Sequence, residues 1–302
     1  MVAFSRILCP VDFSACSELA LDYALSLARE RGASVSVMHV LPRVIADPDV
    51  YPYLAEPVLV SGETRERAYK QLGSFVSRAL SKSVAADVVL ESGDVVEEIL
   101  GKSERLDPDL VVVGTHGRRG FQRLLLGSVT ERLLRRSKTP VLSVAPSAGP
   151  PPREGETFGR ILCPVDFSPS SLAGLRTALS LAGERGEVLV LHLVEFYYDP
   201  GMGEAIAYDL GELREGNVAR AEEKIRELIP ESARPRVRLR VEVLRSGGAY
   251  REILRIAGEE KSGLLVMGVA GRTASDLLFF GSTANHVVRA AAAPVLTVRA
   301  EG

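Results

Sequence analysis

A glycine-rich stretch near the end of the first half of the chain has residue types and a spacing that could bind phosphate. Gly114, Gly117 and the pair Gly127-Ser128 have the spacing Gly-x2-Gly-x9-Gly-Ser, between an apolar run and a predicted helix over residues 128–136. Glycines lack a Cβ, so their backbone N–H groups can converge on one point. The first N–H groups of a helix have no partner within it and lie at its positive end. The stretch therefore predicts a phosphate site.

The same spacing occurs a second time in the chain, at Gly268, Gly271, Gly281 and Ser282. Neither copy continues into Gly-Lys-[Ser/Thr], and neither is the Gly-x-Gly-x-x-Gly that follows the first strand of dinucleotide folds. Simple turns are the alternative. Ser128 and Glu131 also have the Ser-x-x-Glu spacing of a helix capping box, which explains that serine without a ligand. The second copy has Asn285 in place of the glutamate, which weakens this alternative there.

Duplication explains why the glycine pattern occurs twice. The nine residues "RILCPVDFS" stand at Arg6–Ser14 and again, 154 positions later, at Arg160–Ser168, and the glycines recur at the same offset. Between the halves lies "PSAGPPPREGE", whose proline and glycine content is typical of a linker. We predict one domain over residues 1–146, a linker over 147–157 and a second domain over 158–302.

Predicted strands and helices alternate within each half. The strands of the first half are expected at residues 6–11, 34–41, 87–91, 109–114 and 141–144, with helices at 14–32, 64–80, 95–103 and 128–136 and an irregular segment at 42–61. Alternation predicts a parallel sheet that is covered by helices on both faces. Right-handed crossovers make the sheet doubly wound. The predicted fold is α/β, with two tandem domains and mainly parallel five-stranded sheets.

Ligands of such sheets bind beyond the carboxyl ends of the strands. Three places in each half qualify, the third being the glycine motif. The first strand ends in Pro-Val-Asp, and the second strand ends in His-Val or His-Leu. The corresponding residues are Pro10, Val11, Asp12 and Val40 in the first half, and Pro164, Val165, Asp166 and Leu193 in the second. His39 and His192 end apolar strands, and we expect structural roles for both.

Composition excludes several classes of protein. The net charge of −2 gives no electrostatic footprint for nucleic acid. The apolar runs are too short to span a membrane, and the N-terminus has no signal-peptide pattern. Cys9, Cys16 and Cys163 form neither a disulfide framework nor a metal motif. We expect a cytoplasmic protein without nucleic-acid or membrane partners.

These motifs resemble those of the universal stress protein family. The resemblance rests on Pro-Val-Asp-x-Ser after the first strand and on Gly-x2-Gly-x9-Gly-Ser before the last helix. It is close over "VVVGTHGRRGFQRLLLGSVTERLLRRSKTPVLSV" and covers both halves outside the linker. The chain looks like a tandem universal stress protein, which implies an adenine-nucleotide-hydrolase-like, Rossmann-like fold.

The resemblance implies ATP binding, together with Mg²⁺ or Mn²⁺ at the phosphates. By analogy, Asp12 and Asp166 contact the adenosine, while the backbone of Val40 and Leu193 reads the adenine edge. Gly114 and Gly268 lie by the ribose. The phosphate-binding residues would be Gly117, Gly127, Ser128, Gly271, Gly281 and Ser282, and the neighbouring candidates are Val129, Thr283, Arg118 and Arg272. The family also dimerises through its last strand, so "TPVLSV" and "APVLTV" could pair within this chain as a pseudo-dimer. A further homodimer is left open.

The sequence favours nucleotide binding over efficient hydrolysis, which needs a group to orient water or accept a proton. His116 is the only histidine in the first glycine loop, and Ala270 replaces it in the second. We therefore predict no catalytic residue and expect an ATP-binding regulatory or stress-response protein with one site per domain. The alternatives are a slow metal-dependent ATPase or phosphotransferase, and a structural pseudo-dimer that binds nothing.

Overall fold

The computed structural model divides into two compact units, Ala3–Glu156 and Thr157–Gly302. The residues it describes are 4–42, 61–117, 126–153, 156, 158–182, 186–194, 204–243, 248–269 and 280–300, with only the backbone described over 204–215. Among the helices of these segments, none has both the length and the apolarity that a membrane span requires. The predicted irregular segment 42–61 lies almost entirely outside the described residues.

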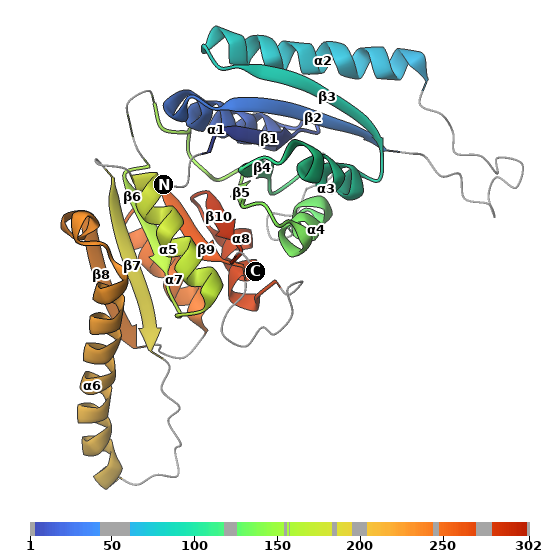
Figure 1. Ribbon diagram of the computed structural model, residues 1–302. Helices are drawn as coiled ribbons and strands as arrows, with labels where there is room; N and C mark the ends of the chain where they lie inside the picture. Colours follow the sequence, from blue (N-terminus) through green and yellow to red (C-terminus); the bar gives the residue numbers. More distant parts are fainter. Residues whose placement is uncertain are drawn as a thin grey trace, which may run out of the picture. The chain divides into compact units, whose positions relative to one another are not determined.

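The first unit contains a five-stranded parallel sheet. Its strands are β1 (Arg6–Pro10), β2 (Ser34–Pro42), β3 (Ala86–Gly93), β4 (Leu110–Gly114) and β5 (Val141–Val144), in the order β3-β2-β1-β4-β5. Its helices are α1 (Ala15–Arg31), α2 (Gly62–Ser81), α3 (Val95–Leu106) and α4 (Ser128–Arg136). Helix α2 lies on one side of the sheet, and α3 and α4 lie on the other (Figure 1). The predicted doubly wound α/β fold is confirmed.

Local sequence explains how β1 leads into α1. Ile7, Leu8 and Cys9 are at most 1% exposed, as expected for a parallel strand that is covered on both faces. The Ser14 side chain accepts a hydrogen bond from the backbone N–H of Ser17 and so caps the start of α1. Gly32 ends the helix with a φ of 65°, a conformation that glycine adopts without strain.

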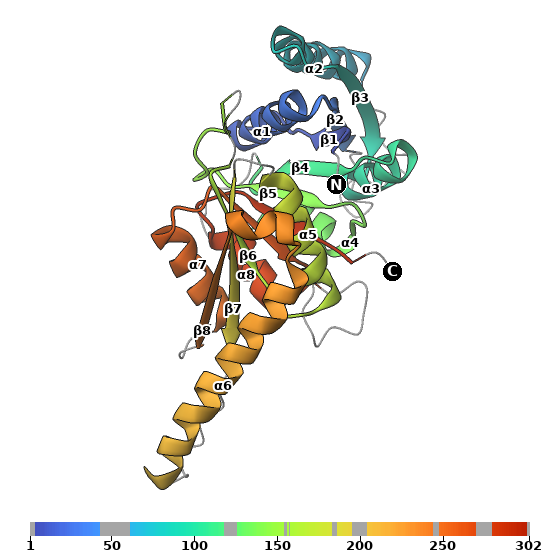
Figure 2. The same ribbon diagram turned by 60° about the vertical axis from the view of Figure 1, so that its left-hand side comes forward.

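The second unit repeats this arrangement. Its strands are β6 (Arg160–Pro164), β7 (Glu187–Val194), β8 (Val237–Val243), β9 (Leu264–Gly268) and β10 (Val295–Val298), in the order β10-β9-β6-β7-β8. Its helices are α5 (Pro169–Ala182), α6 (Glu204–Leu228), α7 (Ala249–Glu259) and α8 (Ser282–Ala290), and a short 3-10 helix, Glu231–Arg236, precedes β8. Figure 2 shows α5 and α6 on one face of this sheet, with α7 and α8 on the other.

Ion pairs help to hold the outer strand β8 in place. The Glu260 side chain, which is 13% exposed, forms ion pairs with Arg160, with Arg238 at 3.2 Å and with Arg240 at 3.3 Å. Two of these arginines alternate with apolar residues along β8. Ion pairs therefore connect β8 to the residue that follows α7.

The chain that follows β5 is attached to α1. The Tyr23 hydroxyl donates to the carbonyl oxygen of Gly149 at 2.9 Å, and the Ser26 hydroxyl donates to that of Pro152 at 2.7 Å. Burial raises the pKa of Tyr23 to about 12. The first part of the predicted linker thus runs along a helix of the first unit, while the domain boundaries themselves stay a prediction.

Candidate functional site

Strand order reverses beside β1 in the first unit and beside β6 in the second. Strands β2 and β4 flank β1, and strands β7 and β9 flank β6. The chain leaves neighbouring strands in opposite directions at such a point, which opens a crevice beyond their carboxyl ends. The Pro-Val-Asp segments and the glycine motifs both begin at these strand ends, as the sequence predicts.

The turn after β1 fixes the carboxylate of Asp12. Its Oδ1 accepts a hydrogen bond from the backbone N–H of Ser14 at 3.0 Å and another from the Ser14 hydroxyl at 2.6 Å. The backbone N–H of Asp12 donates to Ser17 Oγ at 3.3 Å. Phe13, between Asp12 and Ser14, has a φ of 61°, in the left-handed region. The turn therefore holds the Asp12 side chain at the end of β1.

The second glycine of the motif lies against this carboxylate. A Cβ on Gly117 would stand 2.7 Å from Asp12 Oδ2, closer than real Cβ contacts occur. The loop after β4 and the turn after β1 are thus brought together, although Gly117 is more than 100 residues away in sequence. Arg118, Gly271 and Arg272 lie outside the described residues.

The third glycine begins helix α4. Gly127 is the N-cap residue and donates its N–H to the carbonyl oxygen of Thr115 at 2.8 Å. No side chain of the described residues caps this helix. The capping-box alternative is wrong because it needs Ser128 at the N-cap, whereas Ser128 is the first helical residue. Ser128 is exposed and Val129 is half-buried, so the first turn of α4 keeps its backbone donors without a side-chain cap.

The first glycine has a different structural reason. A Cβ on Gly114 would stand 2.8 Å from the Cys16 sulfur and 3.0 Å from the Cys16 carbonyl oxygen, so the glycine lets α1 pack against β4. The Gly114 carbonyl oxygen accepts a hydrogen bond from the Thr130 hydroxyl at 2.8 Å. Burial and the nearby charge of Asp12 raise the pKa of Cys16, although backbone and side-chain hydrogen bonds from Thr115 and His116 act in the opposite direction. The ribose contact that the resemblance implies for Gly114 stays a prediction.

The end of β2 is joined to the same turn. Val40 is 5% exposed. The imidazole of the preceding residue, His39, places Nδ1 at 2.7 Å from the carbonyl oxygen of Val11, and the Phe13 ring packs on this imidazole with centroids 4.4 Å apart. Sequence reasoning gave Phe13 no role. The sequence feature that could have identified Phe13 is the recurrence of the whole Asp-Phe-Ser triplet in both halves.

The second unit reproduces the backbone of this site. Asp166 Oδ1 accepts a hydrogen bond from the Ser168 N–H at 3.0 Å, and Gly281 donates its N–H to the carbonyl oxygen of Val269 at 2.8 Å. Gly281 is the N-cap of α8, again without a side-chain cap from the described residues. A Cβ on Gly268 would stand 2.7 Å from the backbone of α5. The other predicted residues of this unit are half-buried Pro164, buried Val165, half-buried Leu193, exposed Ser282 and half-buried Thr283.

Side chains around the last two helices differ between the units. In the first, Arg132 of α4 pairs with Asp94 at 3.4 Å and with Glu97 at 3.5 Å. In the second, the corresponding His286 stacks on Tyr250 with centroids 4.4 Å apart and an interplanar angle of 22°. The two sites therefore share a backbone frame but differ in the charge beside it.

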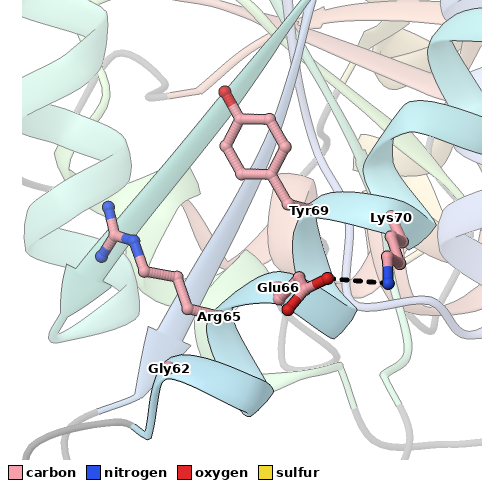
Figure 3. Close-up of a pocket in the computed structure, with 5 residues that line it drawn as sticks. All are labelled: Gly62, Arg65, Glu66, Tyr69 and Lys70. Atoms are coloured by element: carbon pink, nitrogen blue, oxygen red, sulfur yellow. Dashed lines mark ion pairs between the residues drawn. The ribbon is translucent and has the colours of Figure 1, made fainter.

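A surface pocket lies away from these residues. It is lined by residues of the N-terminal part of α2, namely Gly62, Arg65, Glu66, Tyr69 and Lys70 (Figure 3). Glu66 and Lys70 form an ion pair at 2.8 Å, and Tyr69 is 54% exposed. The pocket contains none of the predicted site residues.

Acidic or histidine clusters do not provide a metal site in the described part of the chain, where no group of three or more such side chains could hold an ion.

Comparison with known proteins defines the class. The model of the universal stress protein family matches residues 3–145 and 157–299, and the chain belongs to this family. It matches in two copies, as a tandem member does.

The chain is similar to universal stress proteins that match one half of it and to others that match nearly its full length. It is 30% identical to universal stress protein YxiE of Bacillus subtilis over 146 residues, which are 47% of this chain and 99% of that protein. It is 27% identical to a universal stress protein of Mycolicibacterium smegmatis over 296 residues, 97% and 96% of the two chains. The crystal structure of a universal stress protein from Archaeoglobus fulgidus matches with a TM-score of 0.70 and 23% identity, covering 99% and 98% of the chains, which shows the fold.

Proposed function

We propose that the protein is an ATP-binding regulatory protein with one nucleotide site in each domain. The observation that carries this proposal is the start of α4 and of α8. Each helix follows a glycine loop at the switch point of its sheet and begins at a glycine, without a side-chain cap from the described residues. Uncapped N–H groups at the positive end of a helix are suited to bind a phosphate.

The remaining residues suit the nucleoside end. The carboxylate of Asp12 is held by Ser14 and can accept hydrogen bonds from hydroxyl groups of a ribose. Val40 lies near the carboxyl end of β2, the strand that pairs with β1. In the second domain, Asp166 and Leu193 occupy the corresponding positions. The resemblance to the family's ATP-binding members agrees with this assignment. A bound Mg²⁺ or Mn²⁺ would neutralise part of the phosphate charge.

Slow hydrolysis in the first domain is the second candidate function, and one atom favours it. His116 Nδ1 lies 2.8 Å from the Thr115 hydroxyl oxygen. Its Nε2 is shielded from solvent and has no hydrogen-bond partner among the described residues. Because His116 precedes Gly117 in the phosphate loop, this nitrogen could accept a proton from a water beside the phosphate. The second domain has Ala270 instead and is expected to bind ATP without turnover.

Calorimetric titration of ATP with Mg²⁺ tests the proposal. We expect two ATP per chain for the parent protein, and one for each of Gly127→Val and Gly281→Val. Gly149→Val is the matched control, because a Cβ at Gly149 meets no atom within 4 Å. Phosphate release measured on the same samples, with His116→Ala, separates a nucleotide switch from an ATPase. A parent protein that binds no ATP would contradict the proposal and favour the structural pseudo-dimer instead.

A further inference from the structure

The ends of the first two strands are joined in the same way in both domains. In the first, His39 Nδ1 lies 2.7 Å from the carbonyl oxygen of Val11. In the second, His192 Nδ1 lies 2.6 Å from the carbonyl oxygen of Val165. A carbonyl oxygen only accepts, so Nδ1 carries the proton in each histidine. Each imidazole therefore ties the second strand to the residue that precedes the site aspartate.

A phenylalanine closes over each imidazole. The Phe13 and His39 rings have centroids 4.4 Å apart at 42°, and the Phe167 and His192 rings are 4.8 Å apart at 54°. Both phenylalanines have left-handed backbones, with φ of 61° and 65°. This conformation costs free energy for any residue except glycine. Both copies nevertheless have a phenylalanine there, which indicates that the ring, and not only the turn, is needed. We refer to each histidine–phenylalanine pair as a clamp.

The clamp stands between the two residues that are proposed to contact the nucleoside. Phe13 directly follows Asp12, and His39 directly precedes Val40. Asp12 Oδ1 accepts the hydrogen bond of the Ser14 hydroxyl, and Asp12 Oδ2 lies where a side chain on Gly117 would begin. Movement of the clamp would therefore change the distance between the aspartate and the carboxyl end of β2.

Packing alone does not account for the clamp. The outer contacts of the two phenylalanines differ, because Phe13 packs on Phe75 of α2 with centroids 5.6 Å apart, whereas Lys224 of α6 lies 4.2 Å from the centre of the Phe167 ring. The histidine bond, the ring contact and the left-handed turn are the same in both. The duplication therefore keeps the contacts that join the phenylalanine, the histidine and the end of the first strand.

We propose that His39 with Phe13, and His192 with Phe167, are positioning residues that set the nucleoside half of each site and leave the phosphate half unaffected. This inference rests on the proposed function. It predicts that loss of the clamp weakens adenosine binding, whereas binding of an inorganic polyphosphate to the glycine loop and the α4 N-terminus persists.

The test uses the full chain with one site disabled. In a parent that carries both Asp166→Ala and Gly281→Val, and so lacks a nucleoside contact and a phosphate contact of the second site, His39→Phe keeps a ring against Phe13 but removes the Nδ1 donor. Phe13→Gly removes the ring and fits the left-handed backbone. Dissociation constants are measured by calorimetry for ATP with Mg²⁺, for adenosine and for tripolyphosphate, and thermal unfolding is followed by circular dichroism. We expect adenosine and ATP to bind about tenfold more weakly, which corresponds to about one hydrogen bond, with tripolyphosphate unchanged within twofold.

The reciprocal experiment places His192→Phe in a parent that carries both Asp12→Ala and Gly127→Val, and it should give the same split. Adenosine binding within twofold of the parent in both variants would overturn the inference, as would adenosine and tripolyphosphate affinities that fall together. A parent that binds tripolyphosphate but no adenosine would overturn it while leaving the phosphate site standing. A parent that binds neither overturns the proposed function, and the inference with it.

Discussion

Gly268→Ala tests whether the first glycine of the motif is required for close packing. A Cβ at this position would stand 2.7 Å from the carbonyl carbon of Ser170 and from the nitrogen of Ser171, both in the first turn of α5. These are backbone atoms of a helix, so no side-chain rotation can relieve the contact. Helix α5 must move away from β9 by about 0.7 Å for the pair to reach an ordinary van der Waals distance of 3.4 Å.

The cost follows from two opposing terms. Overpacking of this kind destabilises a protein by about 1–3 kcal/mol, and three contacts below 3.0 Å place Gly268→Ala at the upper end of that range. Alanine also restricts the unfolded chain, which returns about 0.4–1 kcal/mol. The free energy of unfolding should therefore fall by about 2 kcal/mol, or about 6 °C in Tm for a domain of this size.

Urea unfolding followed by circular dichroism measures this change, and Gly258→Ala is the matched control. Gly258 lies in α7, and a Cβ there meets no atom within 4 Å, so alanine should stabilise the domain by about 0.5–1 kcal/mol. Calorimetry of Gly268→Ala should also show weaker ATP binding at the second site, because α5 follows the turn that holds Asp166. If Gly268→Ala were as stable as Gly258→Ala, close approach would not be the reason for the glycine.

Three further changes probe other parts of the structure. Glu260→Gln leaves three arginines without their shared carboxylate, so it should lower the free energy of unfolding by about 2 kcal/mol. Glu231→Gln is the control: the Glu231 side chain is 89% exposed and its ion pair with Arg234 spans 3.7 Å, so the free energy of unfolding should change by less than about 0.5 kcal/mol. Equal effects of the two variants in urea unfolding would contradict this. Lys261 has a φ of 49°, so Lys261→Gly should raise Tm by relieving a left-handed backbone, and a lower Tm would count against strain there. Because burial raises the pKa of Tyr23 from 10.0 to about 12, the folded protein holds this proton more tightly, and stability should fall as pH rises through that window. Tyr23→Phe should remove this part of the pH slope and cost about 1 kcal/mol at neutral pH, measured as unfolding free energy against pH; an unchanged slope would refute the assignment.

Sequence patterns predicted the elements well where their signals are local. The bounds of α4 at residues 128–136 and of β5 at residues 141–144 are those expected, and Ser14 and Gly32 begin and end α1 as predicted. Helix α3 runs three residues further than expected, to Leu106, because its C-terminal signal is weak. Helix ends without a strong stop residue are hard to place from sequence.

The site was predictable as a set of strand ends, but less so as individual roles. Spacing alone cannot separate an N-cap from the first helical residue, so Ser128 satisfied a capping box in sequence that the helix does not form. The contact between Gly114 and Cys16 depends on how closely α1 approaches β4, which no local pattern records. ATP, its metal ion and the pairing of the two last strands stay predictions.

The attachment of the chain to α1 shortens the connection between the domains. Pro152 is fixed through Ser26, and Phe158, 9% exposed, is part of the core of the second unit. Only five residues separate them, so the tether spans at most about 20 Å when fully extended. A short tether keeps each domain at an effective concentration on the order of millimolar to the other. A cut between residues 153 and 157 would remove this linkage, whereas an insertion there would lower the effective concentration only gradually as the tether lengthens.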